Sequence, residues 1–449
     1  MNIKKMVAGI SSATAAIAFA GATPVVTGVT MTQPSDSRRV TITYTMDNAP
    51  AVVTLDVQTN RTGTATEVEA DWVSIGGEFV SNAKGDVWRK VTEADKKNGV
   101  YTIAWNPDQS WPDHKIDNKS ARAVVTAWAL DNTPDYMVVD LTATGGADTQ
   151  RYYPGEAFLP GVEPGKPGAI TNNVLYKTSC MVMRKIMAKD VRWTMGSTAS
   201  EPIKDGYAGR EVAHIVELTN NYYIGVFEVT QDQWTLVKGS CDFVKHKHPY
   251  CPVDNVSFIM ARTADENYTP DAANPVMACD WPNPPGADSF LGVIRAKTGI
   301  DFDLPSEAQW EFAARAGNGV NHWNDGSPMN IDSAGRDPNL DRLGRYAGNV
   351  GSDSDKTKEV GSYKQNSWGL YDMHGNVWEW TLDWYANNIT TLNGAVNETP
   401  MSGKTWRVHR GGSWNEDALY SRAAMRREIE INATRPSVGL RLCCTGGLK

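Results

Sequence analysis

The chain has 449 residues and a formal net charge of −8, from 44 Lys and Arg residues against 52 Asp and Glu residues. This length allows two or three domains with hydrophobic cores. The mildly acidic balance, without long runs of like charge, argues against a nucleic-acid partner, because binding to a phosphate backbone requires a concentrated basic face.

The N-terminus predicts a secretory signal peptide over residues 1–20. Lys4 and Lys5 form a short positive region, residues 6–19 form a stretch of small apolar side chains, and Ala18-Phe19-Ala20 offers a cleavage site. The alternative is a membrane anchor, but a spanning helix needs roughly 20 apolar residues. We therefore expect a secreted, periplasmic or cell-surface protein that keeps no transmembrane anchor once the signal is removed.

Residues 35–144 predict an all-β accessory domain. They contain no cysteine, and their alternating, β-branched runs are separated by turn residues such as Asp47-Asn48-Ala49-Pro50. The runs cover residues 40–44, 51–57, 100–105, 123–128 and 136–141. Short strands at this spacing favour an immunoglobulin- or fibronectin-like sandwich. We find no chemistry in it and expect a stalk or accessory module.

Residues 145–175 predict a linker, because Gly and Pro recur there, most densely in Pro164-Gly165-Lys166-Pro167-Gly168. Beyond it, residues 176–449 predict a few helices with clear ends. Thr230 and Ser306 each begin a capping box, and the helices that follow are expected to stop at Gly239 and Gly317. A third helix is expected over residues 288–297, before Gly299.

All six cysteines fall in this second part: Cys180, Cys241, Cys251, Cys279, Cys443 and Cys444. An exported chain permits disulfides. Cys241 and Cys251 bracket a short polar loop and are the favoured local pair. Cys180 could reach the strand that holds Cys443 and Cys444. Spacing alone leaves the connectivity open.

Several motifs occur in a fixed order beyond residue 176. They are VRWTMGS at 191–197, YIGVFEVT at 223–230, PVDNVSF at 252–258, LPSEAQWEFAAR at 304–315, WGLYDMHGNVWEW at 368–380, RGGSW at 410–414 and GLR at 439–441. Together they resemble the formylglycine-generating enzyme, or sulfatase-modifying factor, family. The resemblance implies an α+β fold of C-type-lectin-like kind with much irregular structure, preceded here by the all-β sandwich.

In the enzymes of this family, two cysteines beyond the Gly-Gly-Ser motif bind copper and drive the oxidation of a substrate cysteine to formylglycine. Soft thiolates select Cu(I), and a carboxylate in their place does not. The matching segment here, residues 413–424, is shorter and contains no cysteine, and Glu416 lies about where the first cysteine would be. Cys443 and Cys444 lie after the GLR motif, where we expect structural roles. We therefore predict no catalytic residue and no bound copper.

The family's calcium sites are better preserved. Residues 372–379 match the segment in which carboxylates and backbone carbonyls bind one Ca²⁺, an all-oxygen ligand set that suits this ion. The ligands implied are Asp372, Gly375, Val377 and Glu379. The alternative is that Glu379 pairs with an arginine. Asn349 and Val350 resemble part of a second calcium site, although the loop that follows them departs in length.

Two other patterns have a simpler interpretation than chemistry. His246-Lys247-His248 has a spacing possible for a metal, but such a run is more typical of a solvated loop. Glu307 and Glu311 could suggest acid–base chemistry. Glu311 lies four residues before Arg315, however, which favours a salt bridge on one helix face.

We therefore predict a non-catalytic binding protein, a pseudoenzyme of its family. Its partner would be an unknown protein, peptide or glycan, recognised by the surface from Trp414 to Arg435, because Trp and Arg dominate interfaces. The candidate ligand-binding residues are Trp414, Asn415, Glu416, Arg422, Arg426 and Arg427. A merely solvated surface is the alternative for the charged cluster. The other functions considered are a formylglycine-generating oxidase acting on sulfatase cysteines and a purely structural cell-surface module.

Overall fold

A computed structural model of the chain describes residues 22–60, 68–109, 120–146, 149–162, 169–198, 201–202, 208–263, 281, 283–319, 322–351, 356–386, 395–396 and 406–444. The predicted signal peptide at residues 1–20 and Cys279 lie outside the described residues. Within these ranges, no helix is long and apolar enough to cross a membrane.

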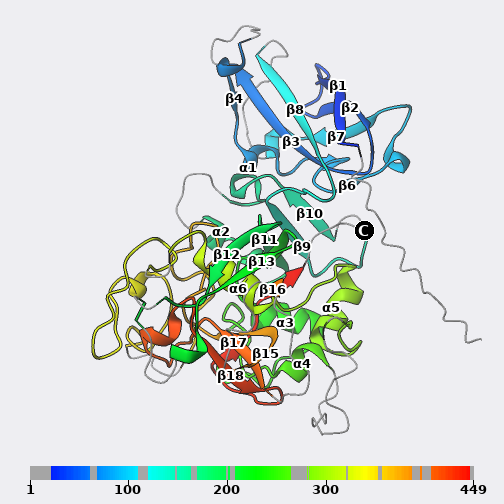
Figure 1. The fold of residues 1–449 in the computed structure, drawn as a ribbon. Helices are drawn as coiled ribbons and strands as arrows, with labels where there is room; N and C mark the ends of the chain where they lie inside the picture. The colour runs from blue at the N-terminus through cyan, green and yellow to red at the C-terminus, as the bar shows by residue number, and fades with distance from the viewer. Residues whose placement is uncertain are drawn as a thin grey trace, which may run out of the picture.

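The N-terminal part consists of two antiparallel sheets that face each other across one core (Figure 1). One sheet has the order β1-β2-β7-β5, with β1 Val25–Thr32, β2 Val40–Asp47, β7 Tyr101–Trp105 and β5 Lys84–Gly85. In the other, β3 Ala51–Asn60 pairs with β4 Trp72–Ser74, β6 Lys90–Val91 and β8 Ala121–Trp128. Alternate side chains of β2 are buried, as the period of an amphipathic strand requires. Four of the predicted strands are confirmed.

The fifth predicted strand belongs to a different sheet, which corrects the boundary expected near residue 144. β9 (Tyr136–Asp140) pairs with β10 (Gln150–Tyr153) and β11 (Cys180–Ile186) in the five-stranded sheet β10-β9-β11-β14-β20. The other members are β14 (Tyr222–Gly225) and β20 (Cys443–Cys444). The predicted linker, residues 145–175, therefore contains a paired strand, and the N-terminal sheets begin at β1, before residue 35. Alternation along a strand reports half-burial but not the pairing partner.

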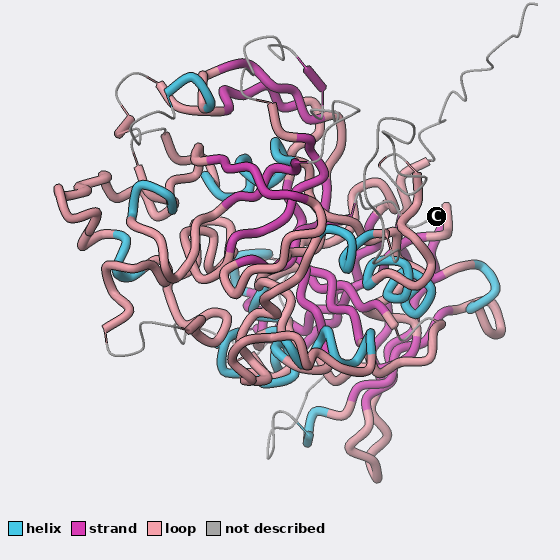
Figure 2. The backbone as a smooth tube through the Cα atoms, turned by 90° about the horizontal axis from the view of Figure 1, so that it is seen from below, coloured by secondary structure: helices cyan, strands magenta, loops and turns pink. Residues whose placement is uncertain are grey.

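The remaining sheets and the longer helices form the C-terminal part, shown in the lower half of Figure 1. One sheet has the order β12-β13-β16, with bounds Val191–Met195, His214–Leu218 and Ala395–Val396. The other has the order β18-β17-β15-β19, with bounds Arg426–Glu430, Trp406–Arg410, Trp378–Trp384 and Val438–Gly439. The helices are α3 Gln231–Lys238, α4 Phe258–Arg262, α5 Phe290–Thr298 and α6 Glu307–Arg315, besides the single turns α1 Gly77–Val80 and α2 Ala169–Asn172. Figure 2 shows how much of the backbone between them is loop.

The predicted helix ends are confirmed within one residue. Thr230 and Ser306 both complete capping boxes. Gly239 and Gly299 adopt the left-handed conformation that ends α3 and α5, where a residue without a Cβ is favoured. α6 stops one residue earlier than expected, because Ala316 itself adopts φ 47°.

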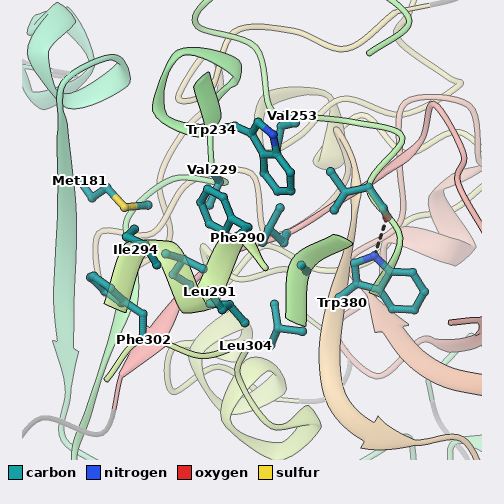
Figure 3. Close-up of a cluster of buried hydrophobic side chains, with 14 of the residues drawn as sticks. Met181, Val229, Trp234, Val253, Phe290, Leu291, Ile294, Phe302, Leu304 and Trp380 are labelled. Atoms are coloured by element: carbon teal, nitrogen blue, oxygen red, sulfur yellow. Dashed lines mark hydrogen bonds between the residues drawn. The ribbon is translucent and has the colours of Figure 1, made fainter. Parts of the chain in front are cut away.

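The largest core lies between these helices and β15 (Figure 3). Trp234 of α3 stacks on Phe290 of α5 with ring centres 4.4 Å apart. The indole N–H of Trp380 donates to the Val256 carbonyl at 2.8 Å, so this buried donor is satisfied. The core therefore fixes α3, α4 and α5 against β15, the strand that begins within the 372–379 segment.

The five described cysteines are all free, so neither of the predicted disulfides is present in the structure. The Cys241 sulfur accepts a hydrogen bond from Thr235 at 3.3 Å, whereas Thr357 interacts with the Cys251 thiol, so the two sulfurs have different neighbours. Cys443 and Cys444 are buried on β20, beside β14. The structural role expected for this last pair agrees with their burial.

Candidate functional site

Acidic residues of α6 meet arginines of β17 and β18 in the interior. The Arg426 guanidinium binds Glu307 with two hydrogen bonds of 2.6 and 2.7 Å. Glu311 binds Arg410 and, at 2.8 Å, Arg315. The predicted Glu311–Arg315 salt bridge is confirmed. Both glutamates are fully buried in ion pairs, so their role is structural.

Arg422 lies in the same interior region, between Glu201 at 3.0 Å and Glu211 at 2.8 Å. Its side chain has no exposed surface. Arg422 and Arg426 were predicted as ligand-binding residues, but both side chains are buried in the structure, so as placed neither faces a ligand. Successive side chains of a strand point to opposite faces, so on β18 Arg426 points inward and Arg427 outward.

Four partly or fully exposed residues and the buried Trp414 beside them form what we call the Glu416 surface: Trp414, Asn415, Glu416, Tyr420 and Arg427. Glu416 and Arg427 form an ion pair of 2.7 Å, with 25% and 32% of their side chains exposed. Asn415 is exposed, and its side-chain oxygen accepts a hydrogen bond from Ser413 at 2.7 Å. Trp414 is largely buried, and its indole N–H donates to the Pro436 carbonyl at 3.0 Å. Four of the six predicted binding residues thus meet on one surface.

The Arg427 guanidinium is held over aromatic rings. Its centre lies 5.1 Å from the ring centre of Tyr420 and 5.9 Å from that of Trp378. A cation over an aromatic face is attracted by the ring quadrupole, so Arg427 is oriented on two sides, by the rings and by Glu416. This is a preorganised polar site on the outside of the β15–β17–β18 sheet.

His409 lies beneath this surface and was missed from the sequence. Its ring centre is 4.5 Å from that of Trp378, and its Nδ1 atom is buried without a hydrogen-bond partner among the described residues. Burial, with the nearby charge of Arg427, holds the pKa of His409 well below its usual value, so the ring is neutral at pH 7. No pattern in the sequence marks His409. Its place becomes evident only from the pairing of β17 with β18, which puts it opposite Arg427.

The thiols of Cys443 and Cys444 belong to a different sheet from the Glu416 surface. Cys443 and Cys444 are on β20, which pairs with β14 in another sheet. Burial raises the pKa of Cys443 well above its usual range and that of Cys444 to about 12. A thiol with a raised pKa is a poor source of the thiolate that binds copper.

The predicted calcium carboxylates are both buried but differ in their partners. Asp372 accepts the Gly361 N–H at 2.7 Å through Oδ2, while its buried Oδ1 has no hydrogen-bond partner in the described part of the chain. Burial raises the pKa of Asp372 to about 6. Glu379 instead binds Arg441 at 2.7 Å and the Trp310 indole N–H at 2.6 Å. As placed, Glu379 therefore has the arginine partner of the alternative interpretation.

Glu228 is a third carboxylate at this position and was missed from the sequence. Its oxygens accept the Asn376 side-chain amide at 2.6 Å and the Val377 N–H at 3.1 Å. Burial raises its pKa well above the usual value, and the charges of Asp372 and Glu379 add to this. Gly375 has φ 128°, and a Cβ there would collide with the Arg345 carbonyl at 2.1 Å.

The weaker metal candidates have other partners. Asn349 closes its own turn, because its side-chain oxygen accepts the Tyr346 N–H at 3.1 Å and its amide donates to the Gly344 carbonyl at 2.9 Å. Val350 follows it, and most of the loop beyond lies outside the described residues. His248 lies 3.5 Å from Glu359 on an exposed loop. Among the described residues, no group of three or more His, Cys, Asp or Glu side chains could hold a metal ion.

Replacing Arg426 should destabilise the folded chain strongly, whereas replacing its neighbour Arg427 should destabilise it little. Arg426→Met removes the closer of the two arginine partners of the buried Glu307, which costs up to about 3–5 kcal/mol. Arg427→Met removes a half-exposed pair worth about 0–1 kcal/mol. Urea denaturation of the two variants measures both values. Equal destabilisation would contradict the inward and outward assignment.

The buried network should also give stability a pH dependence. Burial is the largest cause that raises the pKa of Glu201 from 4.5 to about 7 in the folded chain, against the charges of Arg315 and Arg422. Between these values the folded chain keeps a proton that the unfolded chain has released. The contribution of Glu201 is therefore complete below pH 4.5 and is lost as the pH rises through 7.

The part of this contribution that is lost between pH 5 and pH 8 is on the order of 2–3 kcal/mol. Urea denaturation at pH 5 and pH 8 of the native chain and of Glu201→Gln measures it. The native chain should lose more stability than the variant. The same loss in both proteins would assign the pH dependence to other groups.

Comparisons with known proteins agree with the motifs. A family model described as the sulfatase-modifying factor enzyme 1-like domain matches residues 182–445. The formylglycine-generating enzyme of Mus musculus is 25% identical, over 67% of this chain and 82% of that enzyme. Chaperone protein LppX of Paenibacillus barcinonensis is 28% identical, over 53% of this chain and 84% of that protein.

Among solved structures, Treponema denticola variable protein 1 is similar, with 30% identity, a TM-score of 0.42, and coverage of 59% of this chain and 95% of that one. The family model covers more than half of the chain, including α3 to α6 and β11 to β20. The chain therefore belongs to the sulfatase-modifying factor, or formylglycine-generating enzyme, family.

Proposed function

We propose that this chain is an exported, non-catalytic member of its family that binds a ligand or another protein. One observation carries the proposal: Glu416, which the resemblance puts about where the family's first copper-binding cysteine would be, forms an ion pair with Arg427. The segment around it, residues 413–424, contains no thiol. A carboxylate neutralised by a guanidinium is neither a soft ligand for Cu(I) nor a source of thiolate.

The geometry of the Glu416 surface supports binding. Arg427 is held by Glu416 and by two aromatic rings, so little side-chain freedom is lost when a ligand arrives. Arginines and aromatic residues of this kind dominate protein interfaces. The relative from Paenibacillus barcinonensis carries the name of a chaperone, which also favours a role in binding.

We extend the proposal to the architecture and to export. The sheets and loops of residues 176–449 would have the C-type-lectin-like arrangement, and the N-terminal sheets would form an immunoglobulin- or fibronectin-like accessory module. The pattern of residues 1–20 supports export, with a mature chain that begins after Ala20. Sequencing the N-terminus of protein recovered from outside the cytoplasm tests this last point.

The absence of oxidase chemistry is the first prediction. The purified chain should show no stoichiometric Cu(I) binding and no oxygen consumption with a cysteine-containing sulfatase peptide, because no described thiol is exposed at the Glu416 surface. A copper titration and an oxygen electrode measure both. A formylglycine-generating enzyme with its cysteines intact is the positive control. Turnover by this chain would favour the oxidase alternative.

Loss of binding on replacing Arg427 is the second prediction. A peptide and glycan array identifies ligands of the native chain, and Arg427→Gln should weaken their binding about tenfold, as removal of an interface arginine commonly does. Arg122→Gln is the matched control, because Arg122 also pairs with a glutamate and lies over a tryptophan ring, but in the N-terminal sheets. Equal binding by both variants would remove the Glu416 surface from consideration.

We also propose that Ca²⁺ binds in the 372–379 segment, where Asp372 is free to accept the ion and Glu379 already has other partners. The buried Asp372 Oδ1 lacks a hydrogen-bond partner among the described residues, which suits a cation. Glu379 is held by Arg441 and Trp310 and would have to exchange these partners for the ion. The ligands would be Asp372 and Glu379 with the carbonyls of Gly375 and Val377, and the ion would be structural.

Calcium should then stabilise the folded chain, by about 2.7 kcal/mol at a hundredfold excess over Kd. Differential scanning calorimetry with Ca²⁺ or with a chelator measures the effect. Asp372→Asn should abolish it, whereas Asp242→Asn, at an exposed position, should not. A native chain that shows no calcium effect would mean that Arg441 takes the place of the ion.

A further inference from the structure

A basic loop, residues 243–248, lies beside the Glu416 surface and has no part in the function proposed so far. Lys245 is exposed, and its ammonium group lies 5.9 Å from the ring centre of Trp414. The backbone N–H of Lys245 donates to the buried carboxylate of Asp254 at 3.1 Å. The loop is thus anchored from within, and Lys245 is held against Trp414.

Asn255 joins this loop to a second one. Its side-chain amide donates to the Phe243 carbonyl at 2.9 Å, and its backbone N–H donates to the Arg435 carbonyl at 3.0 Å. Asn255 can do both because it adopts the left-handed conformation, at φ 57°. Since Trp414 also donates to Pro436, next to Arg435, Lys245 and Arg435 are carried by loops fixed on the same indole.

Positive charge predominates at this place. Lys245 and Arg435 are exposed, and neither forms an ion pair with any described carboxylate. Arg427 is also present, but Glu416 neutralises it. Arg427 and Arg435 both lower the pKa of the buried His409, so both guanidinium groups lie near the same ring. The chain as a whole has a net charge of −8, so these two unpaired cations give this part of the surface a charge opposite to that of the whole protein.

The aromatic faces near these cations are covered. Lys245 lies over Trp414, and Arg427 lies over Trp378 and Tyr420. A ligand that approaches therefore meets ammonium and guanidinium groups before any ring. This arrangement disfavours a neutral sugar, which would need an open ring face for stacking. It favours a ligand with carboxylates on a flexible backbone, which can reach cations on separate loops.

We propose that Lys245 and Arg435, on the two loops that meet at Trp414, bind an acidic segment of a partner protein. The proposal rests on the binding function of the Glu416 surface and adds the class of ligand. Carboxylates of the segment would pair with the two unpaired cations, while the Glu416–Arg427 pair borders the site. Because these pairs are exposed, they give selectivity and faster association more than high affinity.

A direct test uses the full mature chain and three fluorescein-labelled peptides of equal length, with the repeats Asp-Gly-Ser, Asn-Gly-Ser and Lys-Gly-Ser. Fluorescence anisotropy should show binding of the Asp peptide only, and added salt should weaken it. Lys245→Gln and Arg435→Gln should each reduce affinity about two- to fivefold, and the double variant about tenfold. Lys189→Gln, which changes an exposed lysine in the turn between β11 and β12, should have no effect.

Two results would overturn the proposal: equal binding of the Asp and Asn peptides, or native affinity in the double variant. Both substitutions are at exposed positions, so an unchanged thermal midpoint confirms that each variant is folded. If the native chain binds only the Asn or Lys peptide and Arg427→Gln weakens that binding, the binding function stands and the acidic ligand is wrong. If heparin binds more tightly through the same two residues, the partner is an anionic glycan and not a protein.

Discussion

Buried charge, more than any single hydrophobic contact, organises the C-terminal part of this protein. Four glutamates and four arginines alternate through the interior in the order Glu211, Arg422, Glu201, Arg315, Glu311, Arg410, Glu307, Arg426. The chain of contacts joins α6 to β17, to β18 and to the loop between these two strands. Each charge is matched by an opposite one, which offsets the large cost of removing it from water.

This network explains why irregular backbone can hold a site in place. Much of the C-terminal part is loop, and loops are usually the mobile part of a domain. Here, Arg422 and Arg426 fix the segment between the Gly-Gly-Ser motif and β18 from its inner side. Glu416 on the outer side of this segment, and Arg427 at the start of β18, are therefore held on a rigid support although no long helix or strand carries them.

The proposed non-catalytic function would mean that this chain retains the fold of its family without the family's copper chemistry. The fold depends on buried ion pairs and on a tryptophan-rich core, neither of which involves the segment's two cysteine positions. Under this proposal a carboxylate at position 416 would destabilise the fold little, because Arg427 neutralises its charge at the partly exposed surface. A binding function needs only what remains, which is a preorganised surface with its own charge pattern.

The sequence by itself determined the family, the capped helices and four of the N-terminal strands, because motifs, caps and alternation are local patterns. The resemblance to the family also drew attention to Glu416, in a segment without a cysteine. Only the tertiary structure decided that β9 belongs to the central sheet, that Arg426 points inward while Arg427 points outward, and that Glu379 pairs with Arg441. It likewise placed His409 beneath Arg427 and Lys245 over Trp414. These facts depend on which strands and loops become neighbours, and no local pattern records contacts between segments that are separate in the sequence.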